Sequence, residues 1–397
     1  MHKDVVNTGA GAFYSPREVQ TGDGCVDRLA EVLRRWGVPT GTVLLVCDAA
    51  LRELGYVERV EDALRQGNYL TTVFADVAGE PDLATAEAVG QAVRRTDHVA
   101  VVGLGGGSAM DLSKIAAALA TNPGEALALA GTGRVRATPL PLVCVPTTTG
   151  TGAEATRIAM LSLHGAKAII NDPALVPLAA VLDPELVASL PAPVTAATGM
   201  DALSHAVESW LSTAASPLSL AASRLAAVEM FTWLPRAYHN GDRPSRRATL
   251  HAAYLAGLAL NAGVVLGHSI AYTIANRTNL PHGVTAAMAL PYCVAYNAEA
   301  AADRIRQIAA VLIGHGGARE LCERLVELNR QLGIPASLSD VGLGSSDVSA
   351  MAAECVEKYP RPTNPEPLER ERLEILYDHL LRGAATDAVR ALAASGR

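Results

Sequence analysis

Hydrophobic residues follow different patterns in the two halves of the chain. Up to about residue 194, short apolar runs rich in β-branched residues alternate with stretches of helical character. Strands that alternate with helices of this length are typical of βαβ units and a parallel sheet. The predicted strands are 43–47, 71–74, 98–102 and 142–145, and the predicted helices are 24–36, 52–66, 81–95 and 109–119.

The strand pattern nearly disappears beyond residue 195, close to Pro191 and Pro193. We therefore expect residues 1–194 to form an α/β domain with a parallel sheet, and residues 195–397 to form an all-helical domain. Ligands bind parallel sheets at the carboxyl ends of the strands, and clefts between domains are common ligand sites. The predicted helices of the second domain are 195–211, 217–238, 246–271, 301–313, 317–332, 345–357 and 368–394.

Composition and charge narrow the class of protein. The 397 residues suit two domains, and with half of them apolar and 18% charged a large core can form. The net charge of −7 is spread among both signs, without a basic stripe for nucleic acid or a polybasic membrane patch. The six scattered cysteines lack a CxxC pair, and the chain shows no signal peptide or transmembrane run. We expect a cytoplasmic protein that acts on a small molecule and binds neither nucleic acid nor membrane.

A glycine-rich turn follows the predicted strand 98–102. Residues 103–108 read GLGGGS, and a helical pattern begins directly after them. Glycine lets the backbone approach a ligand closely, and a helix N-terminus offers N–H groups to a phosphate. The spacing differs from the GxGxxG fingerprint and from a Walker loop, so a plain tight turn is the alternative interpretation.

Two further features could bind the same ligand. The segment PTTTGTGAE, residues 146–154, follows an apolar run and offers hydroxyl groups to phosphate, ribose or amide groups; its alternative role is a helix-capping loop. Asp48 ends the run VLLVCD, where a carboxylate can accept from ribose hydroxyls and repel a 2′-phosphate. Its alternative role is to cap the next helix. Two such loops in one parallel sheet favour a dinucleotide.

Four residues of the second half could bind one metal ion. Asp201 and His205 are four residues apart in a helical context, so both project from one helix face. His268 and His282 would be about 21 Å apart in a continuous helix, but segment 276–281 can break it and present His282 from a loop or a new helix start. One carboxylate and three imidazoles suit iron or zinc better than calcium or magnesium. Unrelated roles for the four residues are the alternative.

Together these motifs resemble one family, the iron-containing (group III) alcohol dehydrogenases of the dehydroquinate-synthase-like fold. The resemblance covers nearly the whole chain and is carried by GGGSAMDLSK, PTTTGTGAEAT, LDPEL, GMDALSHAVE and LPHGVTAAMALP. It implies an N-terminal nucleotide domain, a helical metal domain, NAD as the cofactor and a divalent metal, iron ahead of zinc. The implied metal ligands are Asp201, His205, His268 and His282.

The resemblance also implies roles for individual residues, with two departures. Many family members carry another histidine where this chain has Tyr272, and many carry an asparagine at the position of Asp82. The proton-relay role of that histidine therefore does not carry over; Tyr272 is one candidate for the proton donor, and a relay through water or the ribose is the alternative. Asp48 is implied to favour NAD over NADP. The implied cofactor-binding residues are Asp48, Gly106, Gly107, Ser108, Thr147, Thr148, Thr151 and Lys167.

Three functions are compatible with these observations. The first is reversible hydride transfer between nicotinamide and an alcohol carbon, with the metal polarising the carbonyl, in a homodimer. The second is an NAD- and zinc-using carbocycle synthase (a lyase) of the dehydroquinate synthase type, whose ligand set of a glutamate and two histidines differs from this one. The third is a cofactor-binding regulatory protein without turnover, against which the complete ligand set argues.

Charge suggests the class of substrate. The HSIAYTIA segment is similar to that of family members that reduce phosphonate-bearing carbonyls. Arg157, Lys167 and Arg277 lie in segments that could border the active cleft, and they could bind a phosphonate or carboxylate through charge-assisted hydrogen bonds. The alternative is that Arg157 and Arg277 are solvated and that Lys167 contacts only the cofactor.

Overall fold

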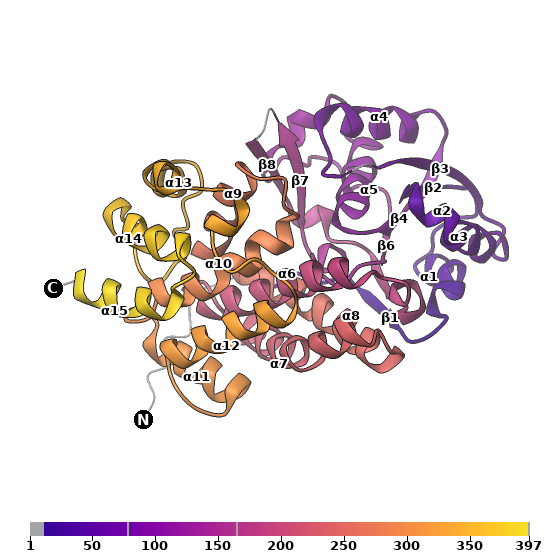
Figure 1. Ribbon diagram of the computed structural model, residues 1–397. Coiled ribbons are helices and arrows are strands. Elements are labelled where there is room, and N and C mark those ends of the chain that lie inside the picture. Colours follow the sequence, from indigo (N-terminus) through magenta and orange to yellow (C-terminus); the bar gives the residue numbers. More distant parts are fainter. Residues whose placement is uncertain (1–11, 78, 164–165, 396–397) are drawn as a thin grey trace. The chain divides into compact units, whose positions relative to one another are not determined.

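The computed structural model describes residues 12–77, 79–163 and 166–395 (Figure 1). The chain divides into two compact units, one of which is Tyr14–Leu190 and the other of which contains Pro191–Arg397. The first unit is α/β with a parallel sheet and the second is helical. The fold class predicted from the sequence is therefore confirmed.

A six-stranded parallel sheet forms the centre of the first unit. Four of its strands coincide with the predicted ones, whereas β1 and β9 have only four residues each, too few to show a clear periodicity. The strand order is β1-β9-β6-β4-β2-β3. The strands are β1 (Glu18–Thr21), β2 (Thr42–Asp48), β3 (Leu70–Val77), β4 (His98–Gly105), β6 (Leu142–Pro146) and β9 (Ala179–Leu182).

Alternate residues of the central strands enter two separate hydrophobic cores. Val43 and Leu45 of β2 pack with residues of α1 and α3, while Leu44 and Val46 pack with residues of α4 and α5. A strand buried on both faces has no polar alternation, which explains the uninterrupted run VLLVC. The helices of this unit are α1 (Leu29–Arg35), α2 (Ala50–Glu53), α3 (Tyr56–Arg65), α4 (Leu83–Arg94) and α5 (Gly107–Leu119).

A second, three-stranded sheet in the first unit was not expected from the sequence. Its strands are β5 (Gly131–Thr132), β7 (Ile158–Leu163) and β8 (Ala166–Asn171), in the order β5-β8-β7. β7 and β8 are antiparallel, and β5 and β8 are parallel. β8 carries Lys167, one of the predicted cofactor residues.

The second unit consists of helices around one large hydrophobic core. α6 is buried along most of its length and lies against α7, α8 and α10. α10, which begins at His282, is absent from the predicted helices. The helices are α6 (Ala192–Leu211), α7 (Pro217–His239), α8 (Arg243–Ala259), α9 (Leu266–Ala275), α10 (His282–Tyr296), α11 (Ala302–Ile313), α12 (Ala318–Gln331), α13 (Ser345–Glu357), α14 (Arg370–Leu381) and α15 (Ala385–Ser395).

Four of the predicted helices are each two separate helices in the structure, so their predicted continuity is wrong. Three of the breaks contain a glycine with positive φ: Gly55 at +73°, Gly263 at +72° and Gly383 at +70°. Residues with side chains rarely adopt this left-handed backbone, which ends a helix. The divided predictions are 24–36, 52–66, 246–271 and 368–394.

Two further observations concern the expected compartment and membrane contact. All six cysteines are buried and free. In the described part of the chain, no single helix is long and apolar enough to span a membrane. Arg243–Ala262 and Leu266–Ala275 reach that length and composition only as a pair bent by 109°.

Candidate metal and cofactor sites

Three helices bring the four predicted metal ligands together. Asp201 and His205 lie one turn apart on α6, His268 lies in the first turn of α9, and His282 begins α10. Oδ1 of Asp201 lies 3.8 Å from Nε2 of His205, 3.8 Å from Nε2 of His268 and 3.7 Å from Nε2 of His282. The predicted helix break is confirmed, because α9 ends at Ala275 and α10 starts at His282.

The donor atoms fit a shared metal ion better than they fit one another. Distances of 3.7–3.8 Å are too long for hydrogen bonds, and Asp201 Oδ1 and His268 Nε2 are buried without a hydrogen-bond partner. Leaving such atoms unsatisfied costs about 1–3 kcal/mol each. Ligands at about 2.1 Å from a tetrahedral ion lie roughly 3.4 Å apart, close to the spacing seen here. The donor atoms of Asp201, His205 and His268 all lie within 4.8 Å of one another and fit a divalent metal, and His282 adds a third imidazole 3.7 Å from Asp201.

The charges of the site favour the protonation states that a metal requires. Burial acts to raise the pKa of Asp201, but the attraction of His205, His282 and His268 outweighs it and lowers that pKa. Burial, together with the neighbouring His205 and His282, lowers the pKa of His268 well below its ordinary range. An ionised carboxylate and a neutral imidazole are the forms that bind a metal.

Glu208 fixes the orientation of His268. Its Oε1 lies 2.7 Å from His268 Nδ1, and its Oε2 accepts from the backbone N–H groups of Val265 (2.9 Å) and His268 (3.2 Å). Burial raises the pKa of this enclosed carboxyl to about 7. With Nδ1 bound to Glu208, Nε2 is directed toward Asp201, as in other sites where a carboxylate orients a metal-binding histidine. Sequence reasoning missed Glu208, although it follows Asp201 by seven residues, which places both on one helix face.

Tyr272 and Arg361 lie beside the ligand set. The Tyr272 ring stacks on His282 at 5.4 Å between centroids and meets His268 edge-on at 6.2 Å. The Arg361 guanidinium lies 5.6 Å from the Tyr272 ring centroid, and its Nε donates to Ser269 Oγ at 3.1 Å. Burial raises the pKa of Tyr272, so its hydroxyl keeps its proton at neutral pH. Arg361 was missed because no local pattern marks it.

The predicted cofactor loops meet at the carboxyl ends of adjacent strands. β4 lies between β2 and β6, and the N–H of Thr147 donates to the last carbonyl of β4 at 2.9 Å. A Cβ atom at Gly107 would lie 2.7 Å from Thr151 Cγ2, and one at Gly106 would lie 3.4 Å from Thr148 Cγ2. The glycine loop and the threonine loop therefore touch, and a side chain at Gly107 would force them apart.

The start of α5 suits a phosphate. Gly106 precedes the helix with extended backbone and no side-chain cap, and Ser108 lies in the first turn. The first N–H groups of such a helix attract an anion. At the end of β2, Asp48 Oδ1 accepts from the N–H of Ala50, the first residue of α2, at 3.2 Å, while Ala49 is the N-cap residue of that helix. Asp82 caps α4 by accepting from the backbone N–H of Thr85.

The three cations proposed for an anionic substrate already have partners. Lys167 on β8 forms an ion pair with Glu80. Arg277 pairs with Glu354 at 2.6 Å. Arg157 lies over a tyrosine ring, 4.8 Å from its centroid. Two of the three charges are thus neutralised by carboxylates, which weakens the case for them as anion-binding residues.

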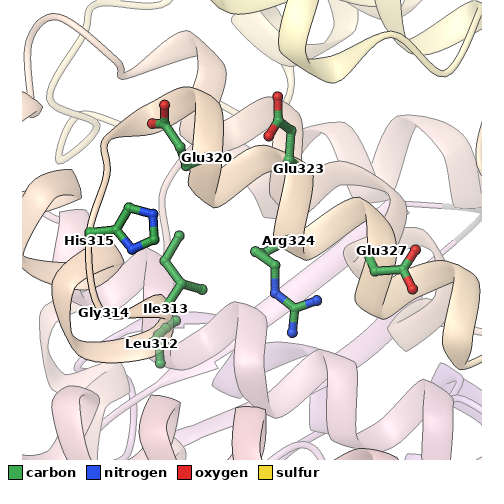
Figure 2. Close-up of a pocket in the computed structure, with 8 residues that line it drawn as sticks. All are labelled: Leu312, Ile313, Gly314, His315, Glu320, Glu323, Arg324 and Glu327. Atoms are coloured by element: carbon green, nitrogen blue, oxygen red, sulfur yellow. The ribbon is translucent and has the colours of Figure 1, made fainter.

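A separate surface hollow lies between the end of α11 and the start of α12 (Figure 2). Its acidic side chains are already engaged: Glu320 accepts from the N–H of Gly317, Glu323 pairs with Arg319, and Glu327 pairs with Arg330. Its lining residues are Leu312, Ile313, Gly314, His315, Glu320, Glu323, Arg324 and Glu327.

Comparison with known proteins gives matches over both units. Residues 16–184 match the family model described as iron-containing alcohol dehydrogenase, and residues 195–381 match the C-terminal model of the Fe-containing alcohol dehydrogenase family. Long-chain-alcohol dehydrogenase 1 of Geobacillus thermodenitrificans is 35% identical over 383 residues, which cover 92% of this chain and 95% of that protein.

Solved structures are also similar to this chain over nearly its whole length. A 1,3-propanediol oxidoreductase superposes with a TM-score of 0.89 at 28% identity, over 94% of this chain and 100% of that one. The sulfoacetaldehyde reductase of Bifidobacterium kashiwanohense, solved in complex with NAD⁺, superposes with a TM-score of 0.86 at 27% identity, over 94% and 99%. Both family models match this chain, and a relative that covers nearly its whole length is 35% identical to it. This chain therefore belongs to the iron-containing alcohol dehydrogenase family.

Proposed function

We propose that this chain reduces a small aldehyde with NADH, and oxidises the corresponding alcohol, at a metal held by Asp201, His205, His268 and His282. The observation that carries the proposal is the convergence of three imidazole Nε2 atoms on Oδ1 of Asp201. When bound, the metal polarises the substrate carbonyl and the nicotinamide supplies the hydride. The family match does not favour the carbocycle synthase alternative.

The residues of the chain prepare this centre before substrate arrives. Asp201 contributes the one negative charge among the ligands, and Glu208 keeps the His268 ring in its binding orientation. Tyr272 places its ring next to the rings of His268 and His282, and its raised pKa keeps its hydroxyl protonated. We infer that this hydroxyl donates the proton that converts the reduced carbonyl into an alcohol.

Replacing Tyr272 with phenylalanine tests that role. The ring and its stacking on His282 remain, and only the proton donor is lost. General acid catalysis contributes typically 10²–10⁴-fold, so we expect kcat for aldehyde reduction to fall about a hundredfold or more while metal content is unchanged. NADH absorbance and metal analysis measure the two quantities. An unchanged kcat would assign the proton to water or to the cofactor ribose instead.

We further infer that the aldehyde carries an anionic group, a phosphonate, sulfonate or carboxylate. One structural relative is a sulfoacetaldehyde reductase, whose substrate bears a sulfonate. The HSIAYTIA segment points to the same substrate class. A cation that forms none of the ion pairs within the described residues, Arg361, lies next to the proposed metal ligands and supplies a recognition group of matching charge.

The assay of this function uses metal-loaded enzyme and pairs of aldehydes. Phosphonoacetaldehyde, sulfoacetaldehyde and succinic semialdehyde are compared with propanal and butanal by following NADH absorbance. We expect kcat/KM to be at least about tenfold higher for an anionic aldehyde, since a charged hydrogen bond contributes about 1.5–3 kcal/mol. Faster turnover of neutral aldehydes would contradict the anionic substrate alone. No NADH oxidation with any aldehyde would contradict the dehydrogenase itself.

Cofactor preference should follow Asp48. A carboxylate at the end of β2 disfavours a 2′-phosphate, so we expect NADH to be used at least about tenfold better than NADPH. Asp48→Gly should narrow this gap. Asp97→Gly removes the same charge just before β4, at the amino edge of the sheet, and should leave the ratio unchanged. Better use of NADPH by the unmodified enzyme would show that Asp48 does not face the ribose.

Three features remain predictions. We propose that the enzyme is a homodimer, that it is cytoplasmic, and that it has no nucleic-acid or membrane partner. The acidic net charge of −7 supports the lack of a nucleic-acid partner. Light scattering of the full chain tests the homodimer.

A further inference from the structure

We propose that Arg361 binds the anionic group of the substrate and is thereby the residue that sets its specificity. The inference rests on the proposed anionic aldehyde and names the side chain that recognises it. Arg361 replaces Arg157, Lys167 and Arg277 in this role.

The first argument is the position of Arg361 relative to the ligand set. Its guanidinium lies 5.6 Å from the centroid of Tyr272, whose ring stacks on His282 at 5.4 Å and 22°. A single aromatic ring therefore separates the cation from a metal ligand.

The second argument is that the side chain is held in place. Its Nε donates to Ser269 Oγ at 3.1 Å, and Ser269 Oγ in turn donates to the backbone carbonyl of Tyr359 at 2.6 Å. Ser269 is fully buried and directly follows His268 on α9. The same helix thus presents a metal ligand and the group that orients Arg361. A cation fixed before binding loses little side-chain entropy when it takes a ligand.

The third argument is charge balance. Arg277 and Lys358 both pair with Glu354, at 2.6 and 3.3 Å. By contrast, none of the ion pairs among residues 12–77, 79–163 and 166–395 involves Arg361, although it is partly buried. The planar fork of arginine suits two oxygens of a phosphonate, sulfonate or carboxylate.

These three arguments define the ligand class. An aldehyde whose carbonyl lies at the metal ligands must carry its anionic group on a short linker to reach across the Tyr272 ring. A phosphate of the dinucleotide has the same chemistry as a phosphonate, so the experiment has to separate the two sources.

The kinetic experiment compares three variants of the metal-loaded enzyme. Arg361→Met removes the charge and keeps an apolar stem, and Arg361→Lys keeps the charge without the fork. Lys358→Met is the control, because it removes an exposed cation three residues earlier that is paired with Glu354. We expect Arg361→Met to raise KM for an anionic aldehyde about ten- to a hundredfold and to leave KM for propanal unchanged. Arg361→Lys should restore part of the loss, and the control should match the unmodified enzyme.

Two kinetic outcomes would overturn the proposal. Equal changes in KM for anionic and neutral aldehydes would show that Arg361 serves the fold. A rise in KM for NADH, with the aldehyde preference intact, would assign Arg361 to the phosphates of the cofactor.

A binding measurement keeps the proposal testable without turnover. Isethionate and ethylphosphonate are titrated calorimetrically into metal-loaded enzyme without NADH, and 1-propanol serves as the neutral probe. We expect anion binding that weakens at least about tenfold in Arg361→Met and partly returns in Arg361→Lys. If Arg361→Met does not fold, the comparison of anion affinity between the unmodified enzyme and Arg361→Lys still tests the proposal. Failure of both anions to bind better than 1-propanol overturns the proposal, whereas absence of any aldehyde reductase activity contradicts only the proposed function.

Discussion

We expect His268→Ala to lose the bound metal and with it nearly all turnover. In the proposed site His268 supplies one of four ligand atoms, and its Nε2 is buried without a hydrogen-bond partner. The Lewis acid contributes several kcal/mol of transition-state stabilisation, so kcat/KM should fall at least about a thousandfold. Metal analysis after gel filtration and NADH absorbance measure the two effects. Full metal occupancy in this variant would contradict the ligand assignment.

The controls for this prediction separate metal loss from unfolding. The His282 side chain is 29% exposed, so His282→Ala costs less packing and should lose metal and activity to a similar degree. His239 is exposed on α7 and takes no part in the site, so His239→Ala should retain both. Cooperative thermal unfolding of all three variants would show that the fold survives.

Glu208→Gln should have a smaller effect on metal binding than His268→Ala. The amide keeps the size of the side chain, but it is a weaker acceptor from His268 Nδ1 than a carboxylate. Loss of such an orienting partner typically lowers metal affinity about ten- to a hundredfold. We therefore expect activity at high metal concentration and loss of metal on dilution. Affinity equal to that of the unmodified enzyme would leave Glu208 with a purely structural role.

The elements predicted from the sequence are those with a strong local signal. β2, β4 and β6 are apolar runs long enough to be recognised, and the glycine and threonine loops follow β4 and β6 directly. The pair Asp201 and His205 could be placed on one helix face from spacing alone. For His268 and His282, spacing required only that a helix break lie between them, and the structure has that break.

The missed features depend on contacts between distant segments. β1 and β9 pair with each other and complete one edge of the sheet, but four residues carry too little pattern to be recognised. Arg361 reaches the site only because a loop returns to α9 after almost a hundred residues. The carboxylate partners of Arg277 and Lys167 are also distant in sequence. A count of the cations in one segment therefore overstates the positive charge that is available to a ligand.

Gly283→Ala should damage the metal site through the backbone. Gly283 follows His282 on α10, and a Cβ atom there would lie 2.0 Å from the carbonyl oxygen of Ala197 on α6. Real Cβ atoms essentially never come within 3.0 Å of such a neighbour, so the two helices would have to separate locally by about 1 Å. Ala197 lies one turn before Asp201, so this separation pulls His282 away from the carboxylate that faces it.

The expected result is a combined loss of stability and metal affinity. Overpacking costs about 1–3 kcal/mol, which lowers Tm by several degrees. Metal–ligand distances tolerate only about 0.2 Å, so metal affinity should fall further than the stability change alone explains. Gly344 has room for a Cβ atom and negative φ, so Gly344→Ala should cost at most about 1 kcal/mol and retain the metal. Thermal unfolding with and without metal, together with metal titration, measures both effects. Metal affinity in Gly283→Ala equal to that of Gly344→Ala would show that the contact between α6 and α10 does not set the position of His282.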